Sequence, residues 1–412
     1  MRDNRLTEKI IRKVILFFCV MLSVVVTGIF GMWLYEKCVK HEDLKVYELF
    51  KLPTFTFAES NDEKIAEANK EANDKMLEEA LANGQKAKVI ECAQQDKVRI
   101  LFAGDVLLDD NYAMMSTLHN RGGHIEEAFS QDLIEKMKSA DIFMLNNEFT
   151  FTNRGNATAG KKFTFRANPD NVYFLKDIGT DIVSVANNHI YDFGEVSLLD
   201  TLDTLENADI DYVGAGRNLE EAMKPMYYIV DGFKIAFVSA TQIERLAIPD
   251  TKEATSESAG VLRCMDTTNL LDVIGQAKAN SDFVILYIHW GTESQAEIDR
   301  LQDEQAAIYA EAGVDLIIGD HPHCLQKIEN VSGVPAIFSM GNYWFNSKTQ
   351  NTCLVEVTLS QGKMESFQFI PCIQSDCRTR LLTGDEKLQV IEYMRGLSPN
   401  VTIDDEGFVI FN

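Results

Sequence analysis

From Lys97 onward, short aliphatic runs alternate with longer segments in which apolar residues recur at helical spacing. The aliphatic runs predict buried strands at Val98–Ala103, Ile142–Leu145, Asp181–Val185, Phe283–Ile288 and Leu316–Ile318. The segments between them predict helices at Ile125–Lys138, Val196–Asn207, Asn269–Ala279 and Glu297–Ala312. Alternation of this kind is typical of an α/β core with a largely parallel sheet.

Two further pairs of strands are predicted as antiparallel hairpins, because each pair of β-prone runs flanks a short turn. Asp231-Gly232 is a strong hairpin signal, and Gln361-Gly362 marks the second turn. A final helix is expected at about 385–394, followed by an irregular tail. The paired runs are Met226–Val230 with Phe233–Ser239, and Cys353–Leu359 with Met364–Ile370.

The most apolar part of the chain is 14–35, a run of 22 residues without a charge. As a helix this segment would be roughly 33 Å long, enough for a hydrocarbon core of about 30 Å. Residues 1–13 carry five basic side chains against two acidic ones, so they are expected to stay in the cytoplasm. We predict an uncleaved, single-pass signal-anchor in the cell membrane, with the main domain outside; a cleaved signal peptide is the main alternative.

Composition divides the rest of the chain into a stem, a main domain and a tail. Residues 36–96 are expected to form the stem, because 61–88 is rich in Ala, Glu, Lys and Asn with only a weak apolar stripe. That composition is typical of a solvated helix or a partly disordered spacer, and a coiled coil is a less favoured interpretation. The main domain is assigned to 97–375, and a C-terminal helix and tail to 376–412.

The net charge of −24 argues against nucleic acid as a partner and against broad capture of any polyanion. An anionic substrate would need a local pocket, such as one that contains a metal. The eight cysteines contain no C-x-x-C pair, which disfavours a zinc ribbon. Cys372 and Cys377 could form a disulfide in an oxidising compartment, and buried free thiols are an open alternative.

The side chains that suggest chemistry follow the predicted strands. In open α/β sheets, ligands gather beyond the carboxyl ends of the strands. Carboxylate, amide and imidazole groups there suit one or two divalent metal ions, of Mn, Fe, Zn or Mg. A two-metal centre can clamp an anionic oxygen and activate water near neutral pH. The candidate ligands are Asp105, Glu148, Asn188, His289, His321 and His323, with His189 beside them.

Each of these residues also has a structural explanation when it is taken alone. An aspartate after a strand, such as Asp105, is most often a turn residue or a helix cap. Asn188 could be a turn residue that tolerates positive φ, and His289 could be a satisfied core histidine. Their joint occurrence in this order favours a metal site.

These motifs resemble those of the CapA family of capsule or poly-γ-glutamate synthesis proteins, a branch of the calcineurin-like metallophosphoesterase superfamily. The resemblance runs from about Val98 to Phe345. It implies a metallophosphatase-like sandwich of two mixed β-sheets flanked by helices, here preceded by a transmembrane helix and a stem. The matching motifs are Ala103–Val106, Asn146–Glu148, Phe163–Ala167, Ala186–His189 continuing through Asp192 and Gly194, His289–Gly291, Gly319–His323 and Ser339–Asn342.

By similarity, the ligands divide between two metals, with Glu148 in the position of a bridging aspartate. His189 would donate a proton to a leaving group, and Asp192 would orient its ring. The first metal would be held by Asp105 and His323, and the second by Asn188, His289 and His321.

Two departures from the superfamily pattern bear on the first metal. A histidine usually follows the first aspartate by two residues, and here that position is Leu107. A Gly-Asp motif is replaced by Asn146–Glu148, so the first metal should bind more weakly. Outside the ligand set, Arg166 is the candidate for a fixed anion contact, with Lys161 nearby; a surface salt bridge is the alternative.

The resemblance and the predicted anchor together favour a membrane-anchored, extracytoplasmic protein of capsule or poly-γ-glutamate biosynthesis. Its partners would be an anionic polymer, the membrane and membrane-bound polymer synthase subunits, and not nucleic acid. A metal-dependent hydrolase is one form of this hypothesis. The alternatives are a general extracytoplasmic metal-dependent phosphoesterase and a non-catalytic scaffold of a polymer synthase complex.

Overall fold

The structure, a computed structural model, describes residues 61–94, 97–243 and 251–411. The predicted membrane segment 14–35 and the first part of the predicted stem lie outside these residues. Among the helices of the described part, none combines the length and apolar character needed to cross a bilayer. The described residues belong to one folded unit that begins at Asn61.

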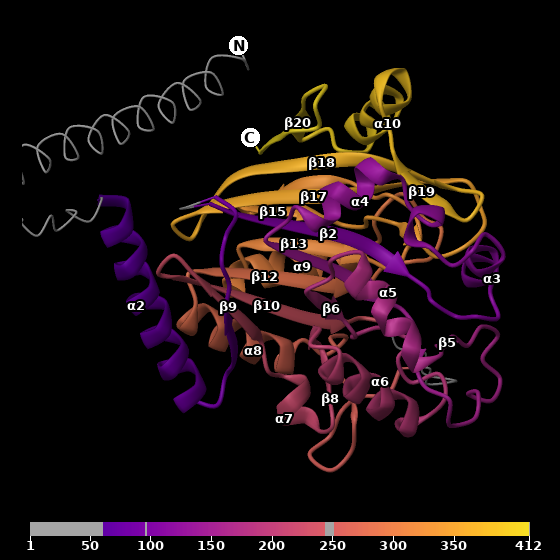
Figure 1. Cartoon of the computed structure of the whole chain (residues 1–412), viewed down its shortest axis with the longest axis horizontal. Helices are drawn as coiled ribbons and strands as arrows, with labels where there is room; N and C mark the ends of the chain where they lie inside the picture. Colours follow the sequence, from indigo (N-terminus) through magenta and orange to yellow (C-terminus); the bar gives the residue numbers. More distant parts are fainter. Residues whose placement is uncertain (1–60, 95–96, 244–250, 412) are drawn as a thin grey trace, which may run out of the picture. The chain divides into compact units, whose positions relative to one another are not determined.

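Two large mixed β-sheets form the centre of this unit (Figure 1). The eight-stranded sheet contains, in spatial order, β19 (Arg378–Leu381), β18 (Lys363–Ser375), β17 (Gln350–Ser360), β2 (Val98–Val106), β3 (Ile142–Asn147), β6 (Ile182–Ser184) and β7 (Asp211–Val213), and β16 (Asn342–Trp344) also pairs with β2. The seven-stranded sheet contains β1 (Lys86–Val89), β9 (Met226–Val230), β10 (Phe233–Thr241), β12 (Phe283–His289), β13 (Leu316–Asp320), β15 (Val334–Ile337) and β14 (Ile328–Val331).

The central strands are buried on both faces, so they are apolar throughout rather than alternating. Ile100 and Phe102 of β2 face the other sheet and belong to the core between the sheets. Leu101 and Ala103 face outward and pack in the core beneath the helices. The hydroxyl of Tyr287, on β12, donates to the carbonyl of Ala103 at 2.7 Å, which links the two sheets.

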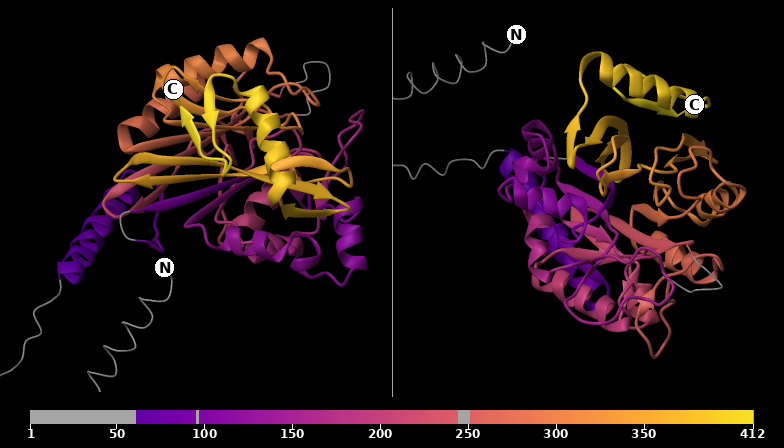
Figure 2. Two further views of the ribbon diagram at one scale, coloured as in Figure 1. Left: turned by 90° about the horizontal axis from the view of Figure 1, so that it is seen from above. Right: turned by 90° about the vertical axis from the view of Figure 1, so that its right-hand side faces the viewer.

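Most of the helices cover the outer faces of the sheets (Figures 1 and 2). The longer ones are α2 (Asn61–Ala82), α3 (Ala113–Asn120), α4 (Gln131–Lys138), α6 (Glu195–Asn207), α8 (Thr268–Asn280), α9 (Arg300–Ala312) and α10 (Gly384–Leu397). The shorter ones are α5 (Val172–Asp177), α7 (Leu219–Ala222), η2 (Ile125–Glu127) and η3 (Pro169–Asn171). Buried side chains of α3 to α6 pack outside the eight-stranded sheet, and those of α8 and α9 pack outside the seven-stranded sheet.

Three pairs of short strands complete the unit. They are β4 (Thr150–Phe151) with β5 (Arg166–Ala167), β8 (Ala215–Gly216) with β11 (Gly260–Val261), and β20 (Val401–Ile403) with β21 (Val409–Phe411). The pair of β20 and β21 lies with α10 over β18 (Figure 2).

The predicted strands of the core are confirmed as β2, β3, β6, β12 and β13, and the hairpins as β9–β10 and β17–β18. The predicted core strands pair in parallel within each sheet, and antiparallel strands added beside them make both sheets mixed. Two mixed sheets flanked by helices agree with the resemblance. The segment predicted as one helix at 125–138 divides into η2 and α4, since Ser130 between them is extended, with φ −70° and ψ 152°.

The folded unit reaches beyond 97–375 at both ends. Strand β1, within the predicted stem, pairs in parallel with β9, and Asn73 of α2 accepts a hydrogen bond from the amide of Gly232 at 2.9 Å. Strand β19 extends the eight-stranded sheet beyond 375. The four residues of β1 are only half buried, so their sequence contains no apolar run. No local pattern therefore distinguished this strand from a spacer.

The six cysteines in the described part of the chain are all free thiols. Cys372 and Cys377, the pair considered for a disulfide, are both buried. The Cys372 thiol lies 3.6 Å from the carbonyl of Ile370, and the Cys377 thiol lies 3.6 Å from that of Ala113. Cys372 and Cys377 are therefore buried free thiols, the alternative that the sequence left open.

Candidate metal centre

Acidic, amide and imidazole side chains meet where four parallel strands end. Asp105 of β2 pairs in register with Asn146 of β3, and His289, the last residue of β12, pairs with Asp320, the last residue of β13. Glu148 follows β3 directly. All five side chains are buried. The carboxyl ends of two strands from each sheet therefore bring titratable and amide groups together among buried side chains.

Three ligand-type atoms converge around His289, and we call Asn188, His289 and His321 the histidine side. Nε2 of His289 lies 2.9 Å from Oδ1 of Asn188 and 3.1 Å from Nδ1 of His321. Oε1 of Glu148 lies 3.7 Å from the same Nε2. Ligands bound at about 2.1 Å to one ion lie roughly 3–3.4 Å apart, so this spacing is that of a coordination shell.

The imidazoles of the histidine side are held neutral. Burial lowers the pKa of His289 to about 3, and the same cause, with the neighbouring His289, lowers the pKa of His321 well below its ordinary value. Neutral imidazole is the form that binds a metal ion. The protein therefore keeps this side ready for a cation without first having to remove protons.

Asp105 and His323 form the other half of the site, which we call the aspartate side. Nδ1 of His323 lies 3.1 Å from Oδ2 of Asp105, and the Asn146 amide donates to Oδ1 at 2.9 Å. Burial opposes the charge on Asp105, but the His323 contact outweighs it and holds the pKa of Asp105 well below its usual range. The same contact raises the pKa of His323 despite its burial.

Glu148 lies between the two sides and is the least satisfied polar group of the site. Neither carboxyl oxygen has a hydrogen-bond partner among the described residues. Burial, with the charges of Asp105 and Asp320, raises the pKa of Glu148 well above its ordinary value. A buried carboxyl without a partner is costly, and a bound cation would relieve that cost. The residues present therefore fit a divalent metal ion.

Asp320 belongs to one of the motifs seen in the sequence, but no role was predicted for it. Its Oδ1 lies 3.0 Å from Nδ1 of His289, which turns Nε2 of that ring toward the site. A carboxylate behind a histidine in this way fixes the ring and makes it a better ligand. Its position beside His321 at a strand end was the signal that could have identified it.

Amide groups complete this supporting layer. Nδ2 of Asn187 donates to Oδ1 of Asn146 at 3.0 Å and to the carbonyl of Asn147 at 2.9 Å. Oδ1 of Asn187 accepts from the backbone amide of His189 at 3.0 Å. These bonds hold the loop after β6 against the end of β3, which positions Asn188 and His189.

His189 is oriented by Asp192, in agreement with the arrangement that the resemblance implied. Nδ1 of His189 lies 2.7 Å from Oδ2 of Asp192, and its Nε2 lies 3.9 Å from Oε1 of Glu148. Burial raises the pKa of Asp192 to about 7, against the opposing effect of Lys161. The Lys161 ammonium contacts both Asp192 and the carbonyl of Asn188, so it anchors the loop rather than facing a ligand.

Two backbone features set the positions of the ligands. His321 and His323 have φ of 93° and 58°, a region that side-chain-bearing residues rarely adopt and that is concentrated at functional sites. Gly104 lies so close to Gly341 that a Cβ there would be 1.9 Å from the Gly341 carbonyl oxygen. The exit of β2 before Asp105 therefore requires glycine.

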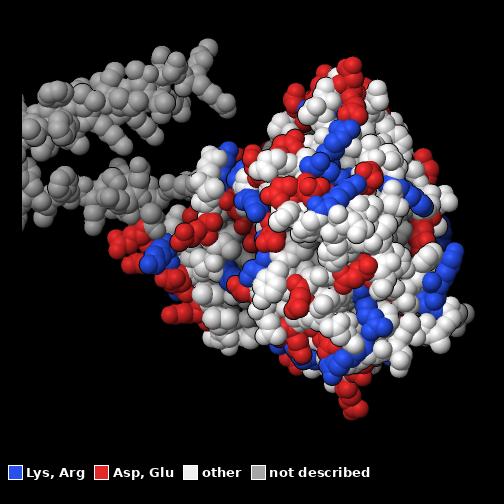
Figure 3. Space-filling model, turned by 45° about the vertical axis from the view of Figure 1, so that its right-hand side comes forward, with Lys and Arg blue, Asp and Glu red and all other residues white. Residues whose placement is uncertain are grey.

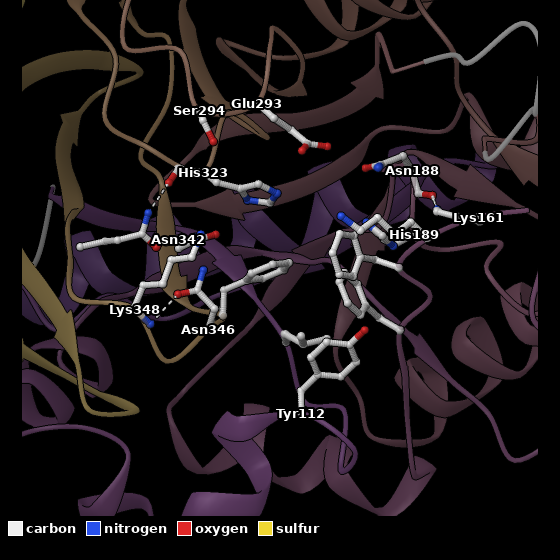
Figure 4. A pocket seen from close by; sticks show the side chains of 16 residues that line it. Tyr112, Lys161, Asn188, His189, Glu293, Ser294, His323, Asn342, Asn346 and Lys348 are labelled. Atoms are coloured by element: carbon white, nitrogen blue, oxygen red, sulfur yellow. Dashed lines mark hydrogen bonds between the residues drawn. The ribbon is translucent and has the colours of Figure 1, made fainter.

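A cavity of about 470 Å³ opens onto this site (Figure 4). Asn188, His189 and His323 line it, so the site can be reached from solvent. All six predicted ligands and His189 lie in or beside the site. Arg166 does not line the cavity, and its guanidinium lies 3.9 Å from the Phe193 ring centre, so an anion contact by Arg166 stays a prediction. In the sequence, only the guanidinium group of Arg166 had suggested a role in anion binding.

Comparisons with known proteins agree with these motifs. The chain is 31% identical over 217 residues to the PGA biosynthesis protein CapA of Bacillus subtilis (strain 168), covering 52% of this chain and 56% of the relative. It is 31% identical to the capsule biosynthesis protein CapA of Bacillus anthracis, covering 52% of each chain. The chain thus spans about half the length of these relatives.

Two other comparisons are more distant. A probable polyglutamine synthesis accessory protein of Mycobacterium tuberculosis (strain CDC 1551 / Oshkosh) is 27% identical, over 57% of this chain and 66% of the relative. The solved structure of TT1561 of Thermus thermophilus aligns with a TM-score of 0.36 and 10% identity, over 65% of this chain and 97% of that one, which is too weak to bear on fold or function. The model of the bacterial capsule synthesis protein family PGA_cap matches residues 99–347, and the chain belongs to that family.

Proposed function

We propose that this chain is a membrane-anchored, extracytoplasmic protein of capsule or poly-γ-glutamate biosynthesis that acts on an anionic polymer at a site for one or two divalent metal ions. Family membership and the names of the relatives support the biological setting. The apolar run at 14–35 and the basic residues before it support the anchor. The strand ends support the metal-dependent form of the activity.

The observation that carries the metal site is the environment of Glu148. This buried carboxyl faces neutral imidazoles on one side and Asp105 on the other, and neither oxygen has a hydrogen-bond partner among the described residues. One ion would be held by Asn188, His289 and His321 with Glu148, and a second by Asp105 and His323 with Glu148. A divalent ion at this position polarises a bound oxygen and neutralises negative charge.

The remaining roles belong to the side chains around the ions. His189 faces the site through Nε2 and would give a proton to the leaving oxygen or nitrogen of the polymer. Asp192 holds the ring through Nδ1, and Lys161 holds Asp192. These three residues would therefore act as one unit.

The test is a metal analysis of the purified full-length chain, together with hydrolysis of γ-glutamyl and phosphodiester substrates. A metal-dependent enzyme should contain at least one divalent ion per chain and should lose turnover in His189→Ala while it keeps the ion. A chain that binds no divalent ion would remove the metal centre from the proposal.

A scaffold without turnover is the second candidate, and Leu107 favours it. This buried residue lines the cavity where the superfamily pattern has an imidazole, so the aspartate side has fewer ligands than a two-metal enzyme would have. The scaffold predicts that His189→Ala supports capsule production in cells as well as wild type. Loss of the capsule in that variant would favour the enzyme.

A further inference from the structure

Two lysines of the cavity have no acidic partner. Lys162 and Lys348 both line it and are exposed, and neither forms an ion pair within the described residues. The Lys162 ammonium lies 4.8 Å from the centre of the Phe163 ring. Elsewhere, on the face drawn in Figure 3, basic side chains lie among acidic ones. The cavity therefore offers positive charge that the protein does not itself neutralise.

These two lysines differ from Lys161, which also lines the cavity. The side chain of Lys161 is only 4% exposed and is paired with Asp192. The charge of Lys161 is therefore balanced within the protein by Asp192. The charges of Lys162 and Lys348 remain available to a ligand.

The two exposed lysines come from different segments of the chain that both line the cavity. Figure 4 shows Lys348 on one side of the cavity and Lys161, the residue before Lys162, on the other, with His323 and His189 between them. Lys348 belongs to the loop between β16 and β17, and Lys162 to the loop before β5. A ligand that contacts both lysines must cross the metal centre.

We propose that Lys162 and Lys348 form a two-point grip for an internal stretch of a polyanion, whose negative groups contact one lysine on each side of the centre. In this arrangement a single small anion, such as phosphate or free glutamate, would contact one lysine at a time. The cavity of about 470 Å³ lies within the range of about 300–1,000 Å³ that is usual for ligand sites. The inference rests on the proposed function, since it takes a polymer as the ligand.

The centre of the cavity has the opposite charge. Glu293 points into it (Figure 4), and Asp105, Glu148 and Asp320 lie beneath it. A polyanion can therefore cross only when bound metal offsets these carboxylates. Affinity for the polymer should depend on the ion for the centre of the cavity and on the lysines for the two ends.

The test is calorimetric titration of the full-length chain, with Mn²⁺ present, by γ-linked glutamate oligomers of increasing length. Affinity should rise from free glutamate to oligomers that span the cavity. Lys162→Gln and Lys348→Gln should each weaken the binding of long oligomers by about fivefold, and the double variant by about 25-fold, as expected for exposed charge pairs. Raising the salt concentration should reduce the difference between wild type and variants.

Two further variants make the test specific. Lys363→Gln removes an exposed lysine of β18, outside the cavity, and should leave the affinity unchanged. Glu293→Gln removes a negative charge from the cavity and should strengthen binding. A double lysine variant that binds long oligomers as tightly as wild type would overturn the grip.

The same titrations distinguish failure of the grip from failure of the proposed function. If γ-linked oligomers do not bind but α-linked polyglutamate or polyphosphate binds through both lysines, the proposed polymer is wrong and the grip stands. If none of these polyanions binds wild type, the grip is wrong. Metal content, measured in every variant, should equal that of wild type, because neither lysine is a ligand.

Discussion

The aspartate side and the histidine side of the site stabilise their buried polar side chains in different ways. On the aspartate side, a raised pKa on His323 and a lowered pKa on Asp105 let the two residues form their own ion pair. On the histidine side, both imidazoles are held neutral, and the neighbouring Glu148 has no hydrogen-bond partner among the described residues. The aspartate side therefore contains an internal ion pair, whereas the histidine side contains no charged partner of its own.

The two metal positions should therefore not be equivalent. A metal on the aspartate side must displace the proton of His323, so its binding should weaken as the pH falls. A metal on the histidine side meets two imidazoles that are already neutral, and Asp320 orients the ring of His289. We therefore expect one tight ion and one weak ion rather than a symmetric pair.

The largest effect is expected from His321→Ala. Removing one of two imidazoles from the histidine side should abolish the tight ion, because Glu148 and Asn188 cannot replace a nitrogen ligand. Metal analysis of the purified protein should show the loss of one ion per chain. His124→Ala, an exposed histidine outside the site, serves as the control. An unchanged metal content would contradict the assignment of the tight ion to the histidine side.

A smaller effect on the same side is expected from Asp320→Asn. The amide would still occupy the space behind His289 but would no longer carry charge there. Loss of such a support typically lowers metal affinity by about 10–100-fold. Competition against a chelating dye would measure this change, with the exposed Asp272→Asn on α8 as the control. Equal affinities in the two variants would mean that Asp320 does not support the ligand.

Asp105→Asn should act mainly on the weak ion. The variant removes the charged ligand of the aspartate side, and we expect about a tenfold loss at that position because hard cations prefer carboxylate oxygen. The tight ion should remain. Stepwise calorimetric titration separates the two events. If both events weaken to the same extent, the site is a single coupled cluster and the distinction between its sides fails.

The smallest effect, and the one opposite in sign, is expected from Leu107→His. This change restores an imidazole where the superfamily pattern has one, in a residue that already lines the cavity. The weak ion should bind several-fold more tightly. Leu107→Met conserves the volume without adding a ligand and should leave affinity as it is. A Leu107→His protein that folds but gains no affinity would show that ligand number is not what weakens the aspartate side.

The sequence predicted most of what depends on local pattern. Strands such as β12 are unbroken apolar runs because both their faces are buried, and this made them visible. The ligands were visible because polar residues directly after such runs have few structural uses in combination. The resemblance supplied the division into two mixed sheets, which local pattern alone had not predicted.

What the sequence could not predict depends on contacts between distant segments. The place of β1 beside β9 was hidden, because its four residues are only half buried. The support of His289 by Asp320 depends on the register of β12 and β13. The position of Arg166 over the Phe193 ring also depends on a contact between distant segments, which residue type alone could not reveal.

The position of β2 has a consequence for how the protein acquires its site. This strand, which carries Asp105, pairs on one side with β17, so that Ala103 lies opposite Leu354. Contacts between segments so far apart in sequence form slowly, because a long loop must close first. The ribosome must therefore have made the chain as far as β17 before the first ligand strand gains its second neighbour.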